Sequence, residues 1–407
     1  YLELPVDVLN GAVDMSKVKR THTSPVSRPA DIEKAAETLA LLQQANTPMI
    51  IAGSGAWYAD AGESLTRFVE TTNVPVYTMA MGRGVISDEH PLCFESAMGT
   101  RPNSIMAAQV SADFILILGS RIGLPTLFGD IFDPNTTIVQ VDIEPSELGR
   151  NKTIDVPVHS DVRGFLDAML RIVDEEGLEA KLAGRFEPWL EMLRVTDMAA
   201  KSSMVDDWES TNTPIHPMRL AREVNNYMDR EDDYVIADGG DTQIWIGMTR
   251  TARSGGHYMD SGLFGCLGVG IPFANTAKFC FPDKRVLLII GDGSVGFNFM
   301  ELEIAVRRKL PIVVVVSNDL GWGMIRHSQE LRLGHAIADG TWIGDVPYHK
   351  LMDALGGHGA LVTDPEGIAP AIEAAFASGK PALINVMTDP TTISPGSVAL
   401  ASIGAYQ

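Results

Sequence analysis

The 407-residue sequence predicts an α/β fold made of two successive doubly wound parallel-sheet domains, a Rossmann-like domain followed by a second domain of similar architecture. Short apolar runs recur along most of the chain, and amphipathic segments with helical spacing separate them. The runs are continuous rather than alternating, which is typical of parallel strands covered on both faces. Glycine or polar residues follow most of the runs, where a strand would end in a loop.

The composition limits the partners that the protein can have. Lys and Arg number 32 and Asp and Glu number 52, so the net charge is −20, and we expect no nucleic-acid partner because binding to phosphates needs clustered cations. The longest apolar runs, such as Ile312–Val316, are far too short to span a membrane. The three cysteines form no paired motif, which indicates a reducing compartment, so a cytoplasmic protein is expected.

The first part of the chain is expected to contain the end of one domain and the whole of another. The opening residues, YLELPVDVLN, read as an interior strand followed by a loop, so residues 1–20 are assigned to the end of a preceding domain and a linker. Apolar spacing predicts a helix over residues 32–42. Residues 21–185 form the predicted Rossmann-like domain, with strands in the segments PMIIAGSGA, VPVYTMAMG, ADFILILGSRIG and TTIVQVDIEPSELG.

A charged, helical stretch at residues 186–212 is expected to link the two domains. Residues 213–390 form the predicted second domain, with strands in the segments DDYVIADGGDTQIW, DKRVLLIIGDGS, LPIVVVVSNDLGWG and GKPALINVMTDP. Residues 391–407 are small and polar, and we expect them to form a tail that lies over the surface.

The segment from Arg285 to Asp319 reads as a strand, an amphipathic helix and a second strand. A unit of this length makes a right-handed crossover between parallel strands, so Asp292 and the Asn318–Asp319 pair should meet at one carboxyl edge. Oxygen ligands there suit Mg²⁺, and the glycines on either side of Asp292 would let a diphosphate approach the backbone. The alternative interpretation is that Gly-Asp-Gly and Asn-Asp are simply two tight turns.

Gly-Asp-Gly followed at this distance by Asn-Asp resembles the diphosphate–metal motif of thiamine-diphosphate enzymes, in particular the acetolactate synthase-like and 2-hydroxyacyl-CoA lyase superfamily. The segments ADGGDTQIW and SGLFGCLGVGIP resemble its first cofactor-binding turn and the stretch that runs along the cofactor. VQVDIEPSELGRNK resembles the end of its central domain, and YLELPVDV resembles the last strand of its N-terminal domain. The pyrimidine-binding N-terminal domain of the family is therefore expected to be lacking in this chain.

The resemblance implies a set of metal ligands. By register, they are the side chains of Asp292 and Asp319 and the carbonyl oxygen of Gly321, with Asn318 as the alternative to Asp319. The family usually has Asn at the position of Asp319, but a carboxylate also suits Mg²⁺. If Asn318 is not a ligand, we expect it to cap the turn after the strand.

The resemblance also implies residues that contact thiamine diphosphate. Gly239, Asp241 and Thr242 match the first turn, although a carboxylate beside phosphate is unusual, so Asp241 could instead bond to water or to a partner chain. The remaining positions are Gly293 and Ser294 at the diphosphate, Gly265 and Leu267 at the aminopyrimidine, and Trp322 and Met324 in the lining. Leu267, Trp322 and Met324 could equally belong to the hydrophobic core.

The chemistry that the resemblance implies belongs to the cofactor, which breaks or forms a carbon–carbon bond next to a carbonyl group. In the family, a glutamate from a second copy of the chain activates the cofactor, so a homodimer or homotetramer is expected and no activating glutamate can be named here. FAD or ADP is a possible ligand of the central domain, where Ala52–Trp57, Met98–Thr100, Gly119–Gly123 and Asp142 match its site. Arg326 and His327 could reach the substrate or could lie on a surface helix.

The substrate stays open at this level, among a 2-oxo acid, an acyloin, a diketone and a 2-hydroxyacyl-CoA. Acetolactate synthases carry a Trp that corresponds to Ser328 and an apolar residue that corresponds to Arg326, so both positions count against a biosynthetic acetolactate synthase. A non-catalytic nucleotide-binding or regulatory homologue is the alternative from another class. An NAD oxidoreductase is disfavoured, because no acidic residue follows the first glycine turn in the expected setting.

Overall fold

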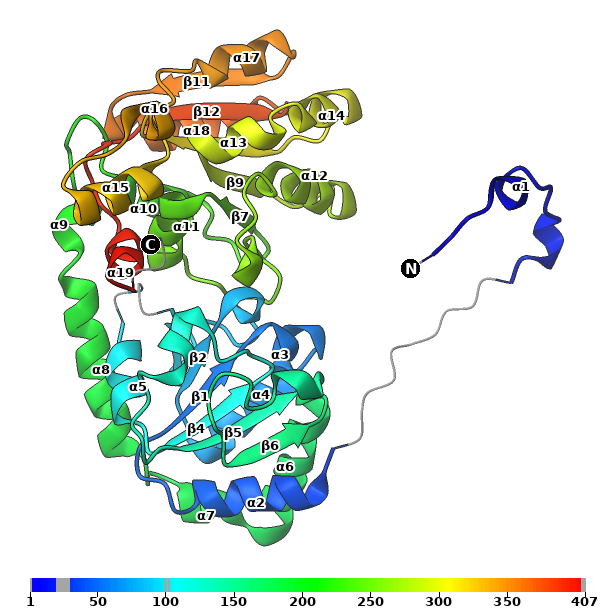
Figure 1. Ribbon diagram of the computed structural model, residues 1–407, viewed down its shortest axis with the longest axis vertical. Coiled ribbons are helices and arrows are strands. Elements are labelled where there is room, and N and C mark those ends of the chain that lie inside the picture. The colour runs from blue at the N-terminus through cyan, green and yellow to red at the C-terminus, as the bar shows by residue number, and fades with distance from the viewer. Residues whose placement is uncertain (1, 20–29, 99–100, 102, 404–407) are drawn as a thin grey trace.

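The computed structural model describes residues 2–19, 30–98, 101 and 103–403, and it confirms two parallel six-stranded sheets, one in each domain (Figure 1). The first sheet has the order β3-β2-β1-β4-β5-β6, the strand order of a doubly wound Rossmann-like sheet. Its strands are β1 (Pro48–Ala52), β2 (Val76–Thr78), β3 (Cys93–Ser96), β4 (Phe114–Leu118), β5 (Thr137–Asp142) and β6 (Val156–His159).

The second sheet has the order β11-β12-β10-β9-β7-β8, and every pair of neighbours in it is parallel. Its strands are β7 (Tyr234–Asp238), β8 (Tyr258–Met259), β9 (Val286–Gly291), β10 (Val313–Asn318), β11 (His358–Val362) and β12 (Ala382–Met387). Alternate residues of a strand enter different cores: Val313 and Val315 pack on one face, and Val314 and Val316 pack on the other. Both faces are therefore covered, as continuous apolar runs predict.

Helices surround both sheets. Those of the first part of the chain are α2 (Ile32–Leu42), α3 (Ser54–Tyr58), α4 (Gly62–Thr72), α5 (Ile105–Ser111), α6 (Val162–Glu176), α7 (Leu178–Leu182), α8 (Glu187–Ser202) and α9 (Val205–Trp208). Those of the second part are α10 (Pro217–Tyr227), α11 (Gly240–Thr249), α12 (Gly270–Cys280), α13 (Asp292–Asn298), α14 (Glu301–Arg308), α15 (Gly323–Leu333), α16 (Ala338–Thr341), α17 (Tyr348–Ala354), α18 (Ile368–Ala377) and α19 (Pro395–Ile403). Within the described ranges, no helix is long and apolar enough to cross a membrane.

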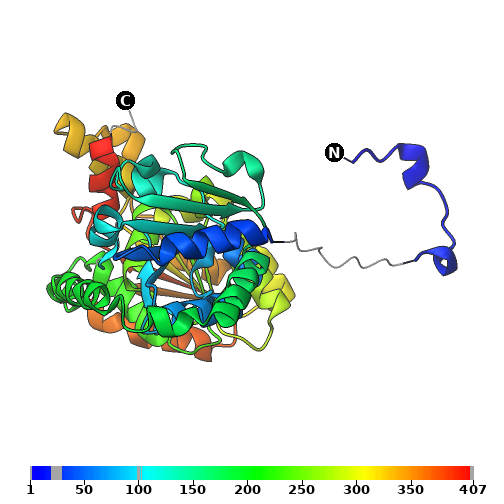
Figure 2. The ribbon, with the colours of Figure 1, turned by 90° about the horizontal axis from the view of Figure 1, so that it is seen from below.

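Helix α8 runs along one side of the molecule between the domains, and the first domain lies in front when the molecule is seen from below (Figures 1 and 2). Trp189, Leu190 and Leu193 of α8 are buried in the core of the first domain. The Trp189 indole also donates to the Pro48 carbonyl oxygen at 2.9 Å. The predicted boundary at residue 185 stays a prediction, and the packing of the first domain extends past it.

The expectation of a strand at the start of the chain was wrong for the described residues. Residues 6–9 form the short helix α1 (Val6–Leu9), and residues 2–19 are exposed. Their hydrogen bonds are local, such as that from the Leu9 amide to the Pro5 carbonyl oxygen at 3.0 Å. A strand needs a neighbour that satisfies its backbone groups, and no described strand pairs with this segment.

Buried polar contacts join the two domains. Arg83 of the first domain is 3% exposed and donates to Asp88 at 2.6 Å and to the carbonyl oxygen of Arg250 in the second domain at 2.7 Å. Arg101 donates to the carbonyl oxygen of Gly247 at 2.6 Å. Because Gly247 lies in α11 and Arg250 directly follows it, both guanidinium groups meet carbonyl groups at the C-terminal end of this helix, where cations are favourable.

Candidate active site

The carboxyl ends of β9 and β10 place two acidic side chains beside each other. The strands are in parallel register with Gly291 opposite Ser317, so Asp292 and Asp319 follow at the same sheet edge. Asp292 is 2% exposed; its Oδ1 accepts the Gly293 amide at 2.9 Å, and its buried Oδ2 has no hydrogen-bond partner. Burial, followed by the proximity of Asp319, raises the pKa of Asp292 to about 8.

Asp319 directly follows the last residue of β10, at the same sheet edge as Asp292. Burial raises the pKa of the Asp319 carboxyl group, and the Arg326 guanidinium, 3.0 Å away, opposes this effect. The next residue, Leu320, has a φ of 66°, which is rare for a branched side chain and indicates a backbone held by its surroundings. Residues in such conformations concentrate at ligand sites.

The side chain of Asn318 is occupied elsewhere. Its amide nitrogen donates to Asn385 at 3.0 Å, and its oxygen accepts the backbone amide of Leu320 at 3.1 Å. Asn318 is the last residue of β10, and it is fully buried next to β12. Asn318 therefore supports the turn, as the alternative interpretation of this residue expected.

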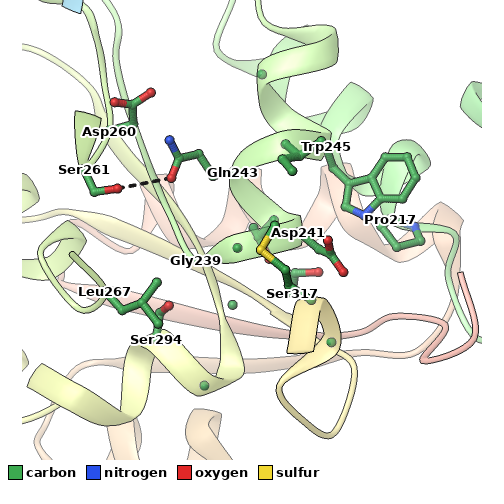
Figure 3. A pocket seen from close by; sticks show the side chains of 18 of the residues that line it. Pro217, Gly239, Asp241, Gln243, Trp245, Asp260, Ser261, Leu267, Ser294 and Ser317 are labelled. Atoms are coloured by element: carbon green, nitrogen blue, oxygen red, sulfur yellow. Dashed lines mark hydrogen bonds between the residues drawn. The ribbon is translucent and has the colours of Figure 1, made fainter. Parts of the chain in front are cut away.

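All predicted cofactor-contacting residues line one cavity of about 490 Å³ at this edge (Figure 3). They are Gly239, Asp241, Thr242, Gly265, Leu267, Asp292, Gly293, Ser294, Asp319, Gly321, Trp322 and Met324. Figure 3 shows Ser294 and Leu267 on one side of this space and Gln243 and Trp245 of α11 on another. Asn318 is not in the lining.

Glycines keep the backbone of the cavity accessible. Gly239 has a φ of 100°, a conformation that side chains rarely adopt, and it turns the chain from β7 into α11. A Cβ on Gly293 would lie 2.6 Å from the Trp322 ring, and a Cβ on Gly240 would lie 2.9 Å from Met324. Any larger residue at these positions would therefore push the cavity lining out of place.

The Asp241 carboxylate makes hydrogen-bonded contacts within the chain. Its Oδ1 accepts hydrogen bonds from Ser394 and Ser397, and its Oδ2 lies 3.0 Å from Nδ1 of His327. Ser394 and Ser397 are fully buried, although both belong to the segment expected to lie over the surface. That expectation was wrong for these residues, because their hydroxyl groups turn inward and donate to Oδ1 of the half-buried Asp241 carboxylate.

Arg326 and His327 differ in their relation to the cavity. His327 lines it, whereas Arg326 lies outside the lining and donates to Asp319 at 3.0 Å and to the Pro390 carbonyl oxygen at 2.7 Å. Ser328 is also absent from the lining, and its hydroxyl donates to the Met324 carbonyl oxygen at 2.7 Å. The two positions that counted against an acetolactate synthase therefore lie behind the wall of the cavity.

The sequence motifs missed several residues of the cavity. Arg83 and Arg101 reach it from the first domain, and Asp260 reaches it from the segment after β8. Burial raises the pKa of Asp260, whose carboxyl group accepts the Gly262 amide at 2.8 Å. Gln243 could have been found, because it lies in the quoted segment ADGGDTQIW, but the two arginines belong to no local pattern.

A second cavity of about 1060 Å³ lies at the carboxyl edge of the first sheet. Gly55 and Trp57 after β1, Gly119 after β4 and Asp142 at the end of β5 line it. Burial raises the pKa of Asp142. Of the predicted Met98–Thr100 segment, Met98 lines the first cavity instead, and residues 99–100 lie outside the described residues.

Comparison with protein families assigns both domains. Residues 35–169 match the thiamine pyrophosphate enzyme central domain, and residues 238–386 match the C-terminal thiamine pyrophosphate binding domain of such enzymes. The second match runs from the last residue of β7 into β12 and includes the edge with Asp292 and Asp319. The class of protein is thus a thiamine-diphosphate-dependent enzyme.

Individual relatives extend over nearly the whole chain. An acetolactate synthase large subunit from Mycobacterium tuberculosis is 33% identical over 410 residues, which cover 98% of this chain and 70% of that protein. A 2-hydroxyacyl-CoA lyase from Oryza sativa is 29% identical over 415 residues, covering 96% of this chain and 69% of the lyase. An oxalyl-CoA decarboxylase from Escherichia coli is 28% identical over 403 residues, covering 96% of this chain and 68% of the decarboxylase. The chain belongs to the thiamine pyrophosphate enzyme family, and its reaction is the cleavage or formation of a carbon–carbon bond next to a carbonyl group.

Proposed function

We propose that this enzyme binds thiamine diphosphate through Mg²⁺ and acts as a lyase or carboligase on a 2-oxo acid, acyloin, diketone or 2-hydroxyacyl-CoA. One observation carries the proposal: Asp292 is buried beside the half-buried Asp319, and Oδ2 of Asp292 has no hydrogen-bond partner. Buried carboxyl groups normally have hydrogen-bond partners or a cation. A divalent cation between them would satisfy the free oxygen and allow both groups to ionise.

The chemistry of the donors fits Mg²⁺. This ion prefers oxygen ligands, takes few carboxylates from the protein and usually shares phosphate oxygens of its ligand. Asp292, Asp319 and the carbonyl oxygen of Gly321 would supply the protein ligands, with Asn318 as the less favoured alternative because its side chain is occupied. Within the described parts of the chain, no three His, Cys, Asp or Glu side chains converge, which disfavours a metal held by the protein alone.

The diphosphate would lie against backbone groups rather than cationic side chains. Gly239 and Thr242 at the start of α11, and Gly293 and Ser294 at the start of α13, line the cavity around the two carboxyl groups. The N-terminal end of α11 favours an anion. In a protein with a net charge of −20, these amides and the metal would offset the charge of the diphosphate.

When bound, the cofactor supplies an electron sink next to the carbonyl carbon of the substrate. Leu267 would support its bent shape, and Trp322 and Met324 would exclude water from the reacting end. Gly265, with a φ of 65°, would bring the backbone close to the aminopyrimidine. No described residue is assigned as the acid or base of the reaction.

Acetolactate synthase is the second candidate, and it is supported by the relative at 33% identity. Arg326 and Ser328 count less strongly against an acetolactate synthase than the sequence suggested, because neither residue lines the cavity. Incubating the enzyme, thiamine diphosphate and Mg²⁺ with pyruvate or with a 2-hydroxyacyl-CoA ester separates the two. Acetolactate from pyruvate would support the synthase, and aldehyde release from the thioester alone would support the lyase. No turnover of any of the proposed substrate classes would contradict the proposal.

The second cavity is proposed to hold FAD or ADP. It lies at the carboxyl ends of the neighbouring strands β1 and β4, where the strand order reverses, and this switch point is where doubly wound sheets bind ligands. A Cβ on Gly55 would lie 2.6 Å from the Cα of Gly119, so only glycine lets these loops pack together. The visible absorption of the purified protein and a calorimetric titration with ADP test this assignment, and it fails if neither ligand is found.

A second copy of the chain is proposed to complete the active site as a homodimer or homotetramer. Two exposed apolar side chains support this assembly. Phe264, in the lining of the second cavity, is 92% exposed, and Phe297, beside the first cavity, is 59% exposed. Phe297 packs edge-on against Trp322 of the lining, with ring centroids 5.8 Å apart. Light scattering at several concentrations tests the assembly, and a monomer throughout would contradict it. A cytoplasmic location stays a prediction.

A further inference from the structure

A short segment near the end of the described chain closes one side of the cavity. Residues 389–403, called the strap from here on, include Asp389 and Thr392 in the cavity lining and then helix α19. The strap follows β12, and the Asp389 amide donates to the Ile215 carbonyl oxygen at 2.9 Å. Helix α19 packs against α15 and α11, which both carry predicted site residues.

The contacts between the strap and α11 are polar and close. Ser394 and Ser397 both donate their hydroxyl groups to Oδ1 of Asp241, and the Ser397 amide donates to the Ser394 hydroxyl at 3.0 Å. A Cβ on Gly396 would lie 1.8 Å from the Ile244 side chain, so no larger residue fits there without a shift. The strap is therefore seated on the N-terminal half of α11.

His327 joins the same carboxylate to the other end of the strap. Its Nδ1 lies 3.0 Å from Oδ2 of Asp241, and its Nε2 lies 3.0 Å from the Pro390 carbonyl oxygen. A carbonyl oxygen can only accept a hydrogen bond, and the carboxylate already accepts two hydroxyl groups. With Asp241 ionised, both partners can only accept, so the two contacts are satisfied when both ring nitrogens carry protons, and this favours the imidazolium form of His327, which is 1% exposed.

These contacts give Asp241 a role other than phosphate binding. Both of its oxygens are occupied by the strap and by His327, and a carboxylate facing a diphosphate would repel it. We infer that Asp241 and His327 are positioning residues that fasten the strap to α11 and thereby close the cavity beside the diphosphate position. The effect on cofactor binding rests on the proposed function, whereas the fastening itself does not.

The charged groups around His327 determine how the attachment of the strap to α11 depends on pH. Asp241 faces it from α11, the Pro390 carbonyl faces it from the strap, and Arg326 precedes it in α15 and pairs with Asp319. Burial lowers the pKa of His327, but the hydrogen bonds to Asp241 and Pro390 outweigh burial and raise the pKa above its usual value. A raised pKa means that the contribution of His327⁺ is complete at low pH and is lost as the pH rises through that value.

Hydrogen exchange of the full chain without cofactor tests the fastening. The double variant Ser394→Ala/Ser397→Ala removes both hydroxyl donors, and Asp241→Asn removes the charge. We expect amide exchange in residues 396–403 to rise about tenfold or more in each variant, because each loses hydrogen bonds to a charged group. Ser402→Ala is the matched control, since Ser402 is exposed on the same helix and donates only to the Val398 carbonyl oxygen. Exchange in the double variant that matches the control would overturn the inference.

The pH dependence provides a readout that a purely structural serine cluster would not give. After correction for intrinsic exchange, protection of α19 should fall as the pH rises through the titration of His327. In Asp241→Asn, this fall should occur at lower pH, because His327 has lost its carboxylate. The same pH profile in the wild type and in Asp241→Asn would contradict a role for His327.

Calorimetry with thiamine diphosphate and Mg²⁺ tests the link to the cavity. The apparent dissociation constant of the double variant should rise in inverse proportion to the fraction of molecules whose strap stays fastened, which gives about tenfold if one molecule in ten stays fastened. Faster exchange with unchanged affinity would overturn the claim that the strap closes the cavity. If the wild type bound no cofactor, the proposed function would fail, and the exchange experiment would still decide the fastening.

Discussion

Asp292→Asn should stabilise the protein in the absence of metal. Burial and the neighbouring Asp319 raise the pKa of Asp292 from 3.8 to about 8. Between these values the folded chain holds a proton that the unfolded chain has released, so the stability of the metal-free protein falls as the pH rises. Each pH unit costs about 1.4 kcal/mol, which amounts to about 4 kcal/mol at pH 7. Asparagine has nearly the same shape and does not ionise, so it avoids this cost.

Urea unfolding at pH 5 and pH 8, with a metal chelator present, measures the effect. We expect the free energy of unfolding of Asp292→Asn to exceed that of the wild type by about 5 kcal/mol at pH 8 and by about 1–2 kcal/mol at pH 5. Asp283→Asn, at an exposed position, is the control and should change little. Thiamine diphosphate with Mg²⁺ should stabilise the wild type and leave the Asp292→Asn variant unchanged. A variant less stable than the wild type at pH 8, or a gain independent of pH, would refute the reasoning.

Three further pairs of variants test the site and the domain interface. Gly293→Ala places a methyl group 2.6 Å from the Trp322 ring and should lower the free energy of unfolding by about 1–3 kcal/mol in urea, whereas Gly296→Ala, which meets no atom within 4 Å, should not. In calorimetry, Asp319→Asn should abolish the Mg²⁺ dependence of cofactor binding. Asn318→Ala should keep this dependence and instead lower the free energy of unfolding by about 1–3 kcal/mol, because it loses two buried hydrogen bonds. The opposite pattern would show that Asn318 is the ligand. Asp88→Ala leaves Arg83 buried without its carboxylate and should cost about 3–5 kcal/mol in thermal or urea unfolding. Glu89→Ala breaks only an exposed pair with Arg253 and should cost less than about 1 kcal/mol, so equal losses would contradict this account of the interface.

The two sheets and the position of the site could be predicted from the sequence because their signals are local. Strands β9 and β10 are apolar runs of a few residues, and parallel strands joined by a crossover must end at the same edge. Once the two strands are recognised, Asp292 and Asp319 are therefore predicted to lie close together. The separation of Asn318 from the cavity follows from the same register, because its side chain points toward β12.

Contacts between distant parts of the chain could not be predicted in this way. Asp241 meets Ser394 across 153 positions, and Asp88 meets the Ala252 amide across 164 positions. Small serines in a polar segment give no sign that they will be buried, and buried arginines have no periodicity of their own. The prediction of a strand in the opening segment YLELPVDV was wrong for a related reason, because an apolar run becomes a strand only where a neighbouring strand accepts its hydrogen bonds.

Calorimetric titration of the full chain with thiamine diphosphate, in Mg²⁺ and in a metal chelator, tests the central claim most directly. If the metal bridges Asp292 and Asp319 to the diphosphate, binding should saturate in Mg²⁺, disappear in the chelator and disappear in Asp292→Asn, while Asp283→Asn binds like the wild type. Equal affinity with and without Mg²⁺, or undiminished binding by Asp292→Asn, would contradict the assignment of these two carboxyl groups as the metal site.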